Sequence, residues 1–243
     1  MPFEKRRTST RIQIIKLGAK LFVEEGYNKT SFSHLSRELN ISLGNITFYF
    51  PTKEHLLAVL CNELCSFQRE LMEKEVGEGY SSLLSYCLEL TSMAAICEED
   101  EVARDFFHSI YSSPLSLDII RDNDTEKTRE IFSEYRSDWT ESKWIEAENL
   151  VSGIEYATIM TREERTPLPL QIEGCLDAIL TLYGVPEELR RQKIQKVLAM
   201  DYRALGRRIL GEFKEYVEKI NEEALIQARA RKKHNPDKKT RLN

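Results

Sequence analysis

Apolar residues recur at helical spacing along nearly the whole chain, and no segment alternates apolar and polar residues with the period of a β-strand. Glycine and proline together number only 17 in 243 residues, so long stretches contain no helix breaker. The pattern predicts an all-α protein. Body helices are expected over residues 53–75, 80–97, 100–112, 123–137, 140–162, 168–183 and 187 to about 230, after an N-terminal group of three helices.

The first helix of the N-terminal group is expected over residues 10–25. Its apolar stripe contains Ile15 and Phe22, and Gly26 follows where the helix should end. Residues 1–9 are basic and are expected to form a flexible arm.

Residues 30–53 predict two short helices joined by a tight turn. Ser31 and Ser42 stand where side-chain oxygens can cap helix N-termini, and Asn40 can adopt the left-handed conformation that ends a helix. Pro51 prevents the second helix from continuing. The two helices are expected over residues 32–39 and 43–50. This arrangement matches the helix-turn-helix of proteins that place the second helix in the major groove of DNA.

The outer face of the second helix carries no charged residue, although surface helices usually carry Lys and Glu there. It comprises Leu43, Gly44, Asn45, Thr47, Phe48 and Tyr49. Asn can bond adenine, Thr can bond a base or contact a thymine methyl, and an aromatic ring can pack on that methyl. A glycine lets the backbone approach closely. The pattern indicates a DNA-reading surface; the alternative is that Phe48 and Tyr49 pack on a neighbouring helix.

Charge is distributed unevenly along the chain. Residues 1–53 hold nine Lys and Arg against four Glu, and residues 227–243 hold seven basic residues against one Asp. Taking +5 and +6 from the total charge of −5 leaves −16 for the residues between them. A basic head on an acidic body suits binding of the head to an anionic polymer. The basic tail is expected to be partly disordered.

Composition excludes several other classes of protein. No apolar run approaches the roughly 18 residues that a membrane span needs, so no membrane partner is expected. The five cysteines, an odd number in apolar helical contexts, suggest reduced thiols in a cytoplasmic protein. Neither a phosphate-binding loop, nor metal-ligand spacing, nor a nucleophile–base arrangement is visible. We therefore expect no catalytic residue, no metal site and no cofactor, and an all-helical enzyme is the less favoured interpretation.

From Ile14 to Leu57 the sequence resembles the DNA-binding domain of the tetracycline-repressor (TetR/AcrR) family. The resemblance is carried by the segments LGAKLFVEEGY, TSFSHLSRELNIS and GNITFYFPTKEHLL. It implies a three-helix head at residues 1–52 and a helical body at residues 53–226 that dimerises and binds an unknown small-molecule effector, followed by the basic tail at 227–243. The implied function is a ligand-responsive repressor that binds double-stranded DNA as a homodimer on a palindromic operator.

The resemblance also assigns roles to individual residues of the head. At the start of the helix expected over residues 32–39, Ser33 and His34 would contact phosphate. The base edges would be reached by Asn45, Thr47 and Phe48, and Tyr49 and Lys53 would contact phosphate. The full predicted DNA-binding set is Ser33, His34, Leu43, Gly44, Asn45, Thr47, Phe48, Tyr49 and Lys53. Two residues depart from the family: Leu43 replaces a frequent Lys or polar residue, and Thr47 replaces the first aromatic of a usual pair. The operator sequence therefore cannot be transferred.

In the body, the resemblance places the dimer interface on the helices at 140–162 and 168–183. Their apolar sides contain Trp144, Leu150, Gly153, Ile154, Ala157, Ile159, Ile172, Leu176, Ile179, Leu180 and Tyr183. The implied effector pocket is lined by Tyr86, Met93, Phe107, Tyr111 and Tyr156, for each of which ordinary core packing is the alternative. A second functional hypothesis keeps the DNA-binding head but replaces the small-molecule effector with a protein partner. The sequence identifies neither the effector nor the direction of regulation.

Overall fold

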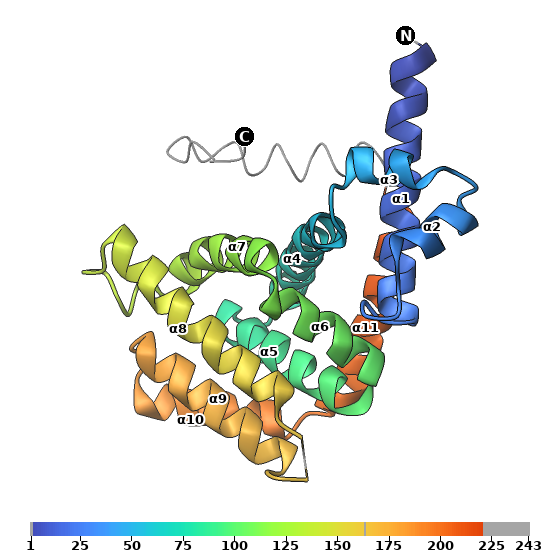
Figure 1. The fold of residues 1–243 in the computed structure, drawn as a ribbon. Coiled ribbons are helices and arrows are strands. Elements are labelled where there is room, and N and C mark those ends of the chain that lie inside the picture. Colours follow the sequence, from blue (N-terminus) through green and yellow to red (C-terminus); the bar gives the residue numbers. More distant parts are fainter. Residues whose placement is uncertain (1, 163, 221–243) are drawn as a thin grey trace.

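The computed structural model describes residues 2–162 and 164–220, and every regular element within these ranges is an α-helix (Figure 1). The helices are α1 (Pro2–Glu24), α2 (Phe32–Glu38), α3 (Leu43–Tyr49), α4 (Lys53–Gly77), α5 (Ser82–Glu99), α6 (Glu101–Ser112), α7 (Pro114–Phe132), α8 (Glu141–Met160), α9 (Leu168–Leu182), α10 (Glu187–Leu198) and α11 (Tyr202–Lys219). The all-α prediction is confirmed. None of these described helices has the length and apolar character that a bilayer span requires.

The N-terminal helix is longer than the sequence suggested. α1 begins at Pro2, so the prediction of a flexible arm over residues 1–9 is wrong for the described backbone. Proline fits the first turn of a helix, and no glycine or proline follows it until Gly18. The helix ends as expected, before Gly26, whose φ of 103° is a conformation that glycine adopts without a Cβ penalty.

The predicted caps of the helix-turn-helix are confirmed. Ser31 Oγ accepts a hydrogen bond from the backbone N–H of His34 at 3.2 Å, and Ser42 Oγ accepts one from Asn45 N–H at 3.2 Å. Between the two helices Asn40 has a φ of 51°, in the left-handed region. The local signals thus fix both the starts of α2 and α3 and the turn between them.

The head shares one core with the body. Phe22, Leu35, Ile46 and Phe50 are buried together with α4 residues such as Leu57. A core of about 50 residues is marginal by itself, and its continuation into α4 supplies the missing cover. Figure 1 shows α4 leading from this head into the body.

Helix α5 is the centre of the body. Its residues from Leu83 to Cys97 are buried on nearly all sides, as expected for a helix that is apolar all round. It packs against α4, α6, α8, α9, α10 and α11. Its C-terminal half joins the core that contains the head, α4, α6 and α11, and its N-terminal half joins a second core with α7–α10.

Two predicted helix boundaries in the body are wrong. α7 begins at Pro114 instead of residue 123, because proline is favourable in the first turn of a helix and does not only interrupt one. The predicted helix from residue 187 onward is broken into α10 and α11, because Asp201 Oδ1 accepts from Ala204 N–H at 3.0 Å and starts a new helix. The remainder of that prediction, and the predicted basic tail, lie outside the described residues.

The predicted apolar dimer surface also needs correction. Most of its members face the chain's own core, and Trp144, Ile159, Ile172, Leu176, Ile179, Leu180 and Tyr183 are each at most 4% exposed. The apolar residues that α8 and α9 actually expose include Leu150 and Leu170, at 51% and 56%. The two helices therefore present a different and narrower apolar surface than helical spacing suggested.

Candidate DNA-binding face and body cavity

The outer face of α3 is exposed from Leu43 to Phe48 and half-buried at Tyr49. Phe48 is 62% exposed and Leu43 47%, while Ile46 and Phe50 on the opposite side are at most 1% exposed. Gly44, Asn45 and Thr47 are exposed as well. The edge of Tyr49 meets Phe48 with the ring centroids 5.1 Å apart, and Tyr49 itself is half-buried against the core of the head, as the alternative interpretation expected for it. α3 thus has an uncharged outer face and a buried inner face that packs in the core of the head.

The predicted phosphate contacts at the start of α2 differ in their surroundings. Ser33 is exposed, whereas His34 is half-buried. The His34 ring lies 3.8 Å from the Glu25 carboxylate and 3.9 Å from that of Glu38. When His34 is protonated, these two carboxylates compete with any phosphate for its charge.

Lys53 is engaged inside the head. Its ammonium donates to the carbonyl oxygens of Tyr27 at 2.9 Å and Thr30 at 3.0 Å, and it lies 3.9 Å from the centre of the Tyr27 ring. Burial lowers the pKa of Lys53, against the opposing effect of the Glu54 carboxylate. An ammonium has three N–H groups, so one remains for a phosphate. The main role of Lys53 in the structure is therefore to bond the start of α4 to the loop before α2.

Hydrogen bonds also link the head to the body. The backbone N–H of Asn28 donates to Asp105 Oδ2 of α6 at 2.9 Å, and the Asn28 side-chain amide donates to Asp105 Oδ1. At the other side of the head, Lys16 Nζ donates to the carbonyl oxygen of Glu218 in α11 at 2.9 Å. The head is therefore bonded to α6 and α11 as well as being continuous with α4.

The body contains a cavity with two adjoining lobes among α4, α5, α6, α7, α8 and α11. The apolar lobe, of about 40 Å³, has walls that include Phe67 and Phe213. The polar lobe, of about 20 Å³, is lined by Asp124 and Glu155. The residues that line both lobes are Leu64, Gln68, Glu89, Met93 and Phe107.

The structure brings only part of the predicted effector pocket together. Met93 and Phe107 line both lobes, and Tyr111 lines the polar lobe. Tyr86 lines neither lobe, since it is packed edge-on against Phe132 in the second core. Tyr156 is 36% exposed and also lines neither lobe; its ring lies beside those of His108 and Tyr111, with centroids 6.1 and 6.4 Å away.

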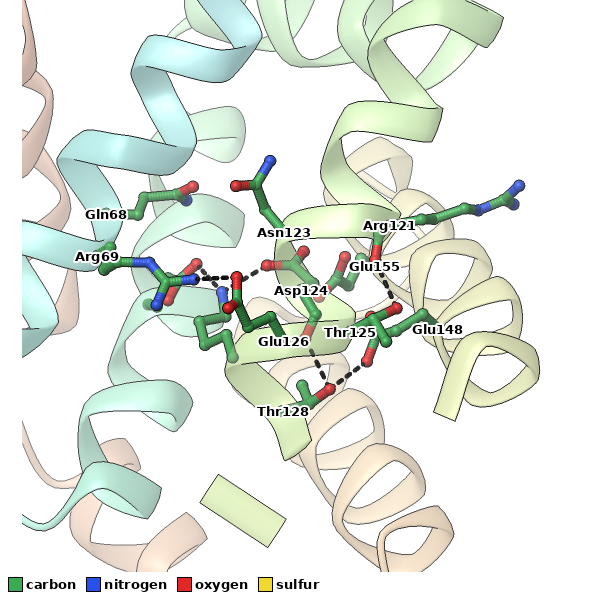
Figure 2. Close-up of polar contacts among 12 residues, drawn as sticks. Gln68, Arg69, Arg121, Asn123, Asp124, Thr125, Glu126, Thr128, Glu148 and Glu155 are labelled. Atoms are coloured by element: carbon green, nitrogen blue, oxygen red, sulfur yellow. Dashed lines mark hydrogen bonds and ion pairs between the residues drawn. The ribbon is translucent and has the colours of Figure 1, made fainter. Parts of the chain in front are cut away.

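Next to the cavity lies a buried network of carboxylates, which the sequence analysis missed (Figure 2). Lys127 Nζ lies 2.9 Å from a Glu89 oxygen and 2.8 Å from an Asp124 oxygen. On α8, Glu155 Oε2 accepts from Tyr111 OH at 2.9 Å, and Glu148 Oε1 accepts from the hydroxyls of Thr128 (2.8 Å) and Tyr183. A signal was present in the sequence, because Glu148 and Glu155 fall at helical spacing on the apolar stripe of Trp144, Val151 and Ile159.

Burial dominates the ionisation of this network. It raises the pKa of Glu148 to about 7, assisted by repulsion from Asp124, and raises the pKa of Glu155 well above its ordinary value. Burial also raises the pKa of Glu89, although Lys127 opposes it. For Lys127 itself burial alone would lower the pKa, but Asp124 and Glu89 outweigh it and the pKa is raised. Lys127 is thus charged, whereas burial favours the neutral forms of Glu89, Glu148 and Glu155.

The described residues contain no group of three or more His, Cys, Asp or Glu arranged to hold a metal ion. What the cavity does offer is a set of aromatic and thioether walls with carboxyl groups at one end.

Comparisons with known proteins identify the N-terminal segment. Residues 14–60 match the profile of the family described as bacterial regulatory proteins, tetR family. The uncharacterized HTH-type transcriptional regulator YuxN of Bacillus subtilis (strain 168) is 45% identical over 68 residues, which are 27% of this chain and 23% of YuxN. The HTH-type transcriptional regulator HbdR of Aromatoleum sp. (strain CIB) is 31% identical over 135 residues, or 52% of this chain and 56% of HbdR. The chain thus spans about a quarter and about half of these two relatives.

Two solved structures match the chain over most of its length, at low sequence identity. The crystal structure of a gamma-butyrolactone receptor (ArpA-like protein) has 19% identity and a TM-score of 0.44, covering 85% of this chain and 99% of that one. The TetR family protein CprB from S. coelicolor A3(2) has 21% identity and a TM-score of 0.41, with coverage of 85% and 99%. The family profile thus identifies residues 14–60 as a segment similar to the tetR family of bacterial regulatory proteins, and the two regulators are similar over 68 and 135 residues of the chain.

Proposed function

We propose that the chain is a cytoplasmic transcriptional regulator whose α3 outer face reads the major groove of double-stranded DNA. The observation that carries the proposal is the exposed, uncharged α3 face, fixed by the Ser42 cap and by the buried Ile46 and Phe50. In this proposal the head comprises residues 1–52 and the body residues 53–226. The base edges are reached by Asn45, Thr47 and Phe48, with Leu43 and Gly44 close to the DNA backbone.

The phosphate contacts of the proposal come from residues around that face. Ser33 and Tyr49 lie at suitable positions, and His34 contributes when it is protonated. Lys53 offers its one remaining N–H group, so its main effect on DNA binding is to hold the loop before α2 in place. The proposal includes no catalytic step, since the matched family consists of regulatory proteins.

We propose that two copies associate through the apolar residues that α8 and α9 expose. Leu150 and Leu170 supply large side chains. At Gly153 and Gly174 a Cβ would meet no atom within 4 Å, so another helix can approach closely there. Two heads related by a two-fold axis would then read the two halves of a palindromic operator in successive major grooves.

The body cavity is the proposed site of effector control, and the regulator is proposed to act as a repressor. Phe107 and Met93 line the cavity, and Asp105, two residues from Phe107 on α6, holds Asn28 of the head. Helix α4 lines the apolar lobe with Phe67 and continues to Lys53 at the head. A ligand that favours one position of α4 and α6 would therefore bias the position of the head. Such control requires that the ligand bind the two head positions with different affinities.

The DNA-binding proposal is tested by selecting tight-binding duplexes from a randomised pool with the full chain and measuring affinity by fluorescence anisotropy. Asn45→Ala and Phe48→Ala are each expected to weaken binding by about 1–3 kcal/mol. Leu115→Ala on α7, which is also exposed, is the matched control and should bind like the wild type. Full affinity in both α3 variants would count against the assignment of the face.

The dimer proposal has a separate test. Leu150→Arg should halve the mass seen by light scattering and weaken operator binding, because a charge replaces an apolar contact. Leu115→Arg introduces the same charge at another exposed leucine and should leave the mass unchanged. An unchanged dimer mass in Leu150→Arg would remove α8 from the interface.

A second candidate function keeps the DNA-binding head but places control in a protein partner. The small size of the lobes, about 40 and 20 Å³, favours it, since ligand pockets usually measure about 300–1,000 Å³. The two candidates are distinguished by whether any small molecule changes the operator affinity of the purified chain.

A further inference from the structure

The described residues that line the two lobes have an unbalanced charge. Four are acids, namely Glu75, Glu89, Asp124 and Glu155, and none is Lys or Arg. The nearest buried cation, Lys127, lies behind the wall, where it bonds Glu89 and Asp124. Arg121 and Arg69 are directed elsewhere, to Ser152 and to the exposed carboxylates of Glu126 and Glu130 (Figure 2). Lys127 can offset only one of the two carboxylates that it bonds, so the walls hold more acidic than basic groups and offer carboxyl acceptors to a ligand.

Several polar atoms in the same walls lack a hydrogen-bond partner among the described residues, and Ser92 Oγ and Glu89 Oε2 are two of them. Ser92 is 1% exposed and lines the apolar lobe, and its Oγ makes no hydrogen bond to any described residue. Glu89 Oε2 is likewise inaccessible and without a bond, although Oε1 accepts from Lys127 at 2.9 Å. A buried carboxylate oxygen without a donor is costly, so each is a position where a ligand's N–H group would be stabilised.

We propose that this cavity binds an amphipathic organic cation, with a protonated amine in the polar lobe and an apolar body in the apolar lobe. The inference rests on the proposed function, because it names the ligand class for the effector cavity. The amine would donate to Glu89 Oε2 and to the carboxyl groups of Asp124 and Glu155. Its charge would also lie beside the rings of Phe107 and Tyr111, which attract cations.

The arrangement disfavours other ligands. An anion would meet four acidic groups and no Lys or Arg in the described lining, and each of the four that is ionised would repel it. A neutral alcohol can supply one O–H donor but cannot offset the negative charge. A metal ion lacks a suitable set of ligands among the described residues.

The apolar lobe suits the body of such a ligand. Its walls include Phe67, Phe106, Phe213 and the flexible side chains of Met72 and Met93. At about 40 Å³ it holds a few water molecules, so a ligand must displace the walls to bind. Two of those walls belong to α4 and α11, and both helices contact α1 of the head. Binding of the cation is thereby linked to the position of the head.

The test uses the full chain and three probes that share one apolar body: phenylbutylamine, phenylbutanol and phenylbutanoate. Binding is measured by isothermal titration calorimetry, and shorter and longer phenylalkylamines are included so that the fit of the apolar body is sampled. We expect the amine to bind about tenfold or more tightly than the alcohol, which is about 1.4 kcal/mol, and the carboxylate to bind least. Equal binding of the three, tighter binding of the alcohol or the carboxylate, or no binding by any amine would overturn the proposal.

Matched variants locate the binding. Glu89→Gln and Glu155→Gln keep the side-chain volume and should weaken the amine about tenfold while leaving the alcohol unchanged. Glu126→Gln removes an exposed carboxylate of α7 outside the lobes and should change nothing. Wild-type amine affinity in both Gln variants would overturn the site. If those variants fail to fold, alkylation of Cys65 in the wild-type chain locates the binding instead. Cys65 lines the polar lobe, so its alkylation should slow when the amine is present and stay unchanged with the alcohol or the carboxylate. Unchanged alkylation with the amine would contradict the proposal.

The outcome separates this inference from the proposed function. A chain that binds its operator but ignores every amine keeps the DNA-binding proposal and loses the cation site. A chain that binds the amine at Glu89 without any change in operator affinity keeps the cation site and loses ligand-responsive regulation.

Discussion

Replacing Glu148 with glutamine should change how the stability of the protein depends on pH. Glu148 is 1% exposed, and burial together with Asp124 raises its pKa to about 7. In the unfolded chain the same carboxyl group ionises near its ordinary value of 4.5. Below pH 4.5 it is protonated in both states. As the pH rises through the interval, the unfolded state loses the proton first, so the folded state loses stability until the pH passes about 7.

The size of this effect follows from the two values. The interval between 4.5 and about 7 corresponds to about 3 kcal/mol. The substituted glutamine cannot ionise, and its side-chain oxygen can still accept from the Tyr183 and Thr128 hydroxyls that now bond Glu148 Oε1. The Glu148→Gln variant should therefore match the wild type near pH 4.5 and exceed its stability by about 3 kcal/mol at pH 8, or by about 6–12 °C in Tm.

Urea and thermal unfolding at several pH values measure the difference. Glu146→Gln is the control, because Glu146 lies on the same helix but is 51% exposed, so its curve should run parallel to that of the wild type. Glu89 titrates in both proteins, whereas the pKa of Glu155, which Glu148 helps to raise, should be less raised in the Glu148→Gln variant. Parallel curves for Glu148→Gln and the wild type across the whole range would refute the claim that burial suppresses this ionisation.

Three further predictions concern the head and the thiols. Ser42→Ala removes the cap of α3 and should cost about 1 kcal/mol in urea unfolding, with weaker operator binding, whereas Ser42→Asp should retain both; equal stability of the two variants would contradict the role of the cap. Gly26→Ala should destabilise the protein by about 1–3 kcal/mol, because φ is 103° and the added Cβ would lie 2.9 Å from Asp105 Oδ2. The same change at Gly77, where nothing lies within 4 Å, should leave the unfolding curve close to that of the wild type, and similar losses at both sites would disprove the strain. Iodoacetamide at pH 8 should modify the half-buried Cys65 first, and mass spectrometry should show slow reaction at the thiols whose pKa burial raises to about 12, namely Cys87, Cys97 and Cys175.

The helix-turn-helix was predictable because its signals are local. A serine cap, an asparagine in the left-handed turn and a proline after the last helical residue act on their immediate neighbours, and the structure places each as expected. The break between α10 and α11 was missed because Asp201 resembles any polar residue of an exposed helix until its bond to Ala204 N–H is seen.

The candidate cavity was less predictable, since it depends on how distant segments meet. Glu89, Lys127 and Glu155 lie on three different helices, and only the place of Glu155 on an apolar stripe distinguishes one of them from an ordinary surface charge. The family resemblance named Phe107 and Tyr111, which line the polar lobe, together with Tyr156, which lines neither lobe. Only the packing of α8 against α5 and α7 decides which charges are enclosed.

The central claim is that the outer face of α3 lies in the major groove of DNA. Hydroxyl-radical footprinting of the full chain on its selected duplex tests it most directly. The account predicts two protected regions whose centres lie one or more helical turns apart, at multiples of about 10–10.5 base pairs, and their loss in Phe48→Ala. Protection that is uniform along the duplex, or that Phe48→Ala leaves intact, would contradict it.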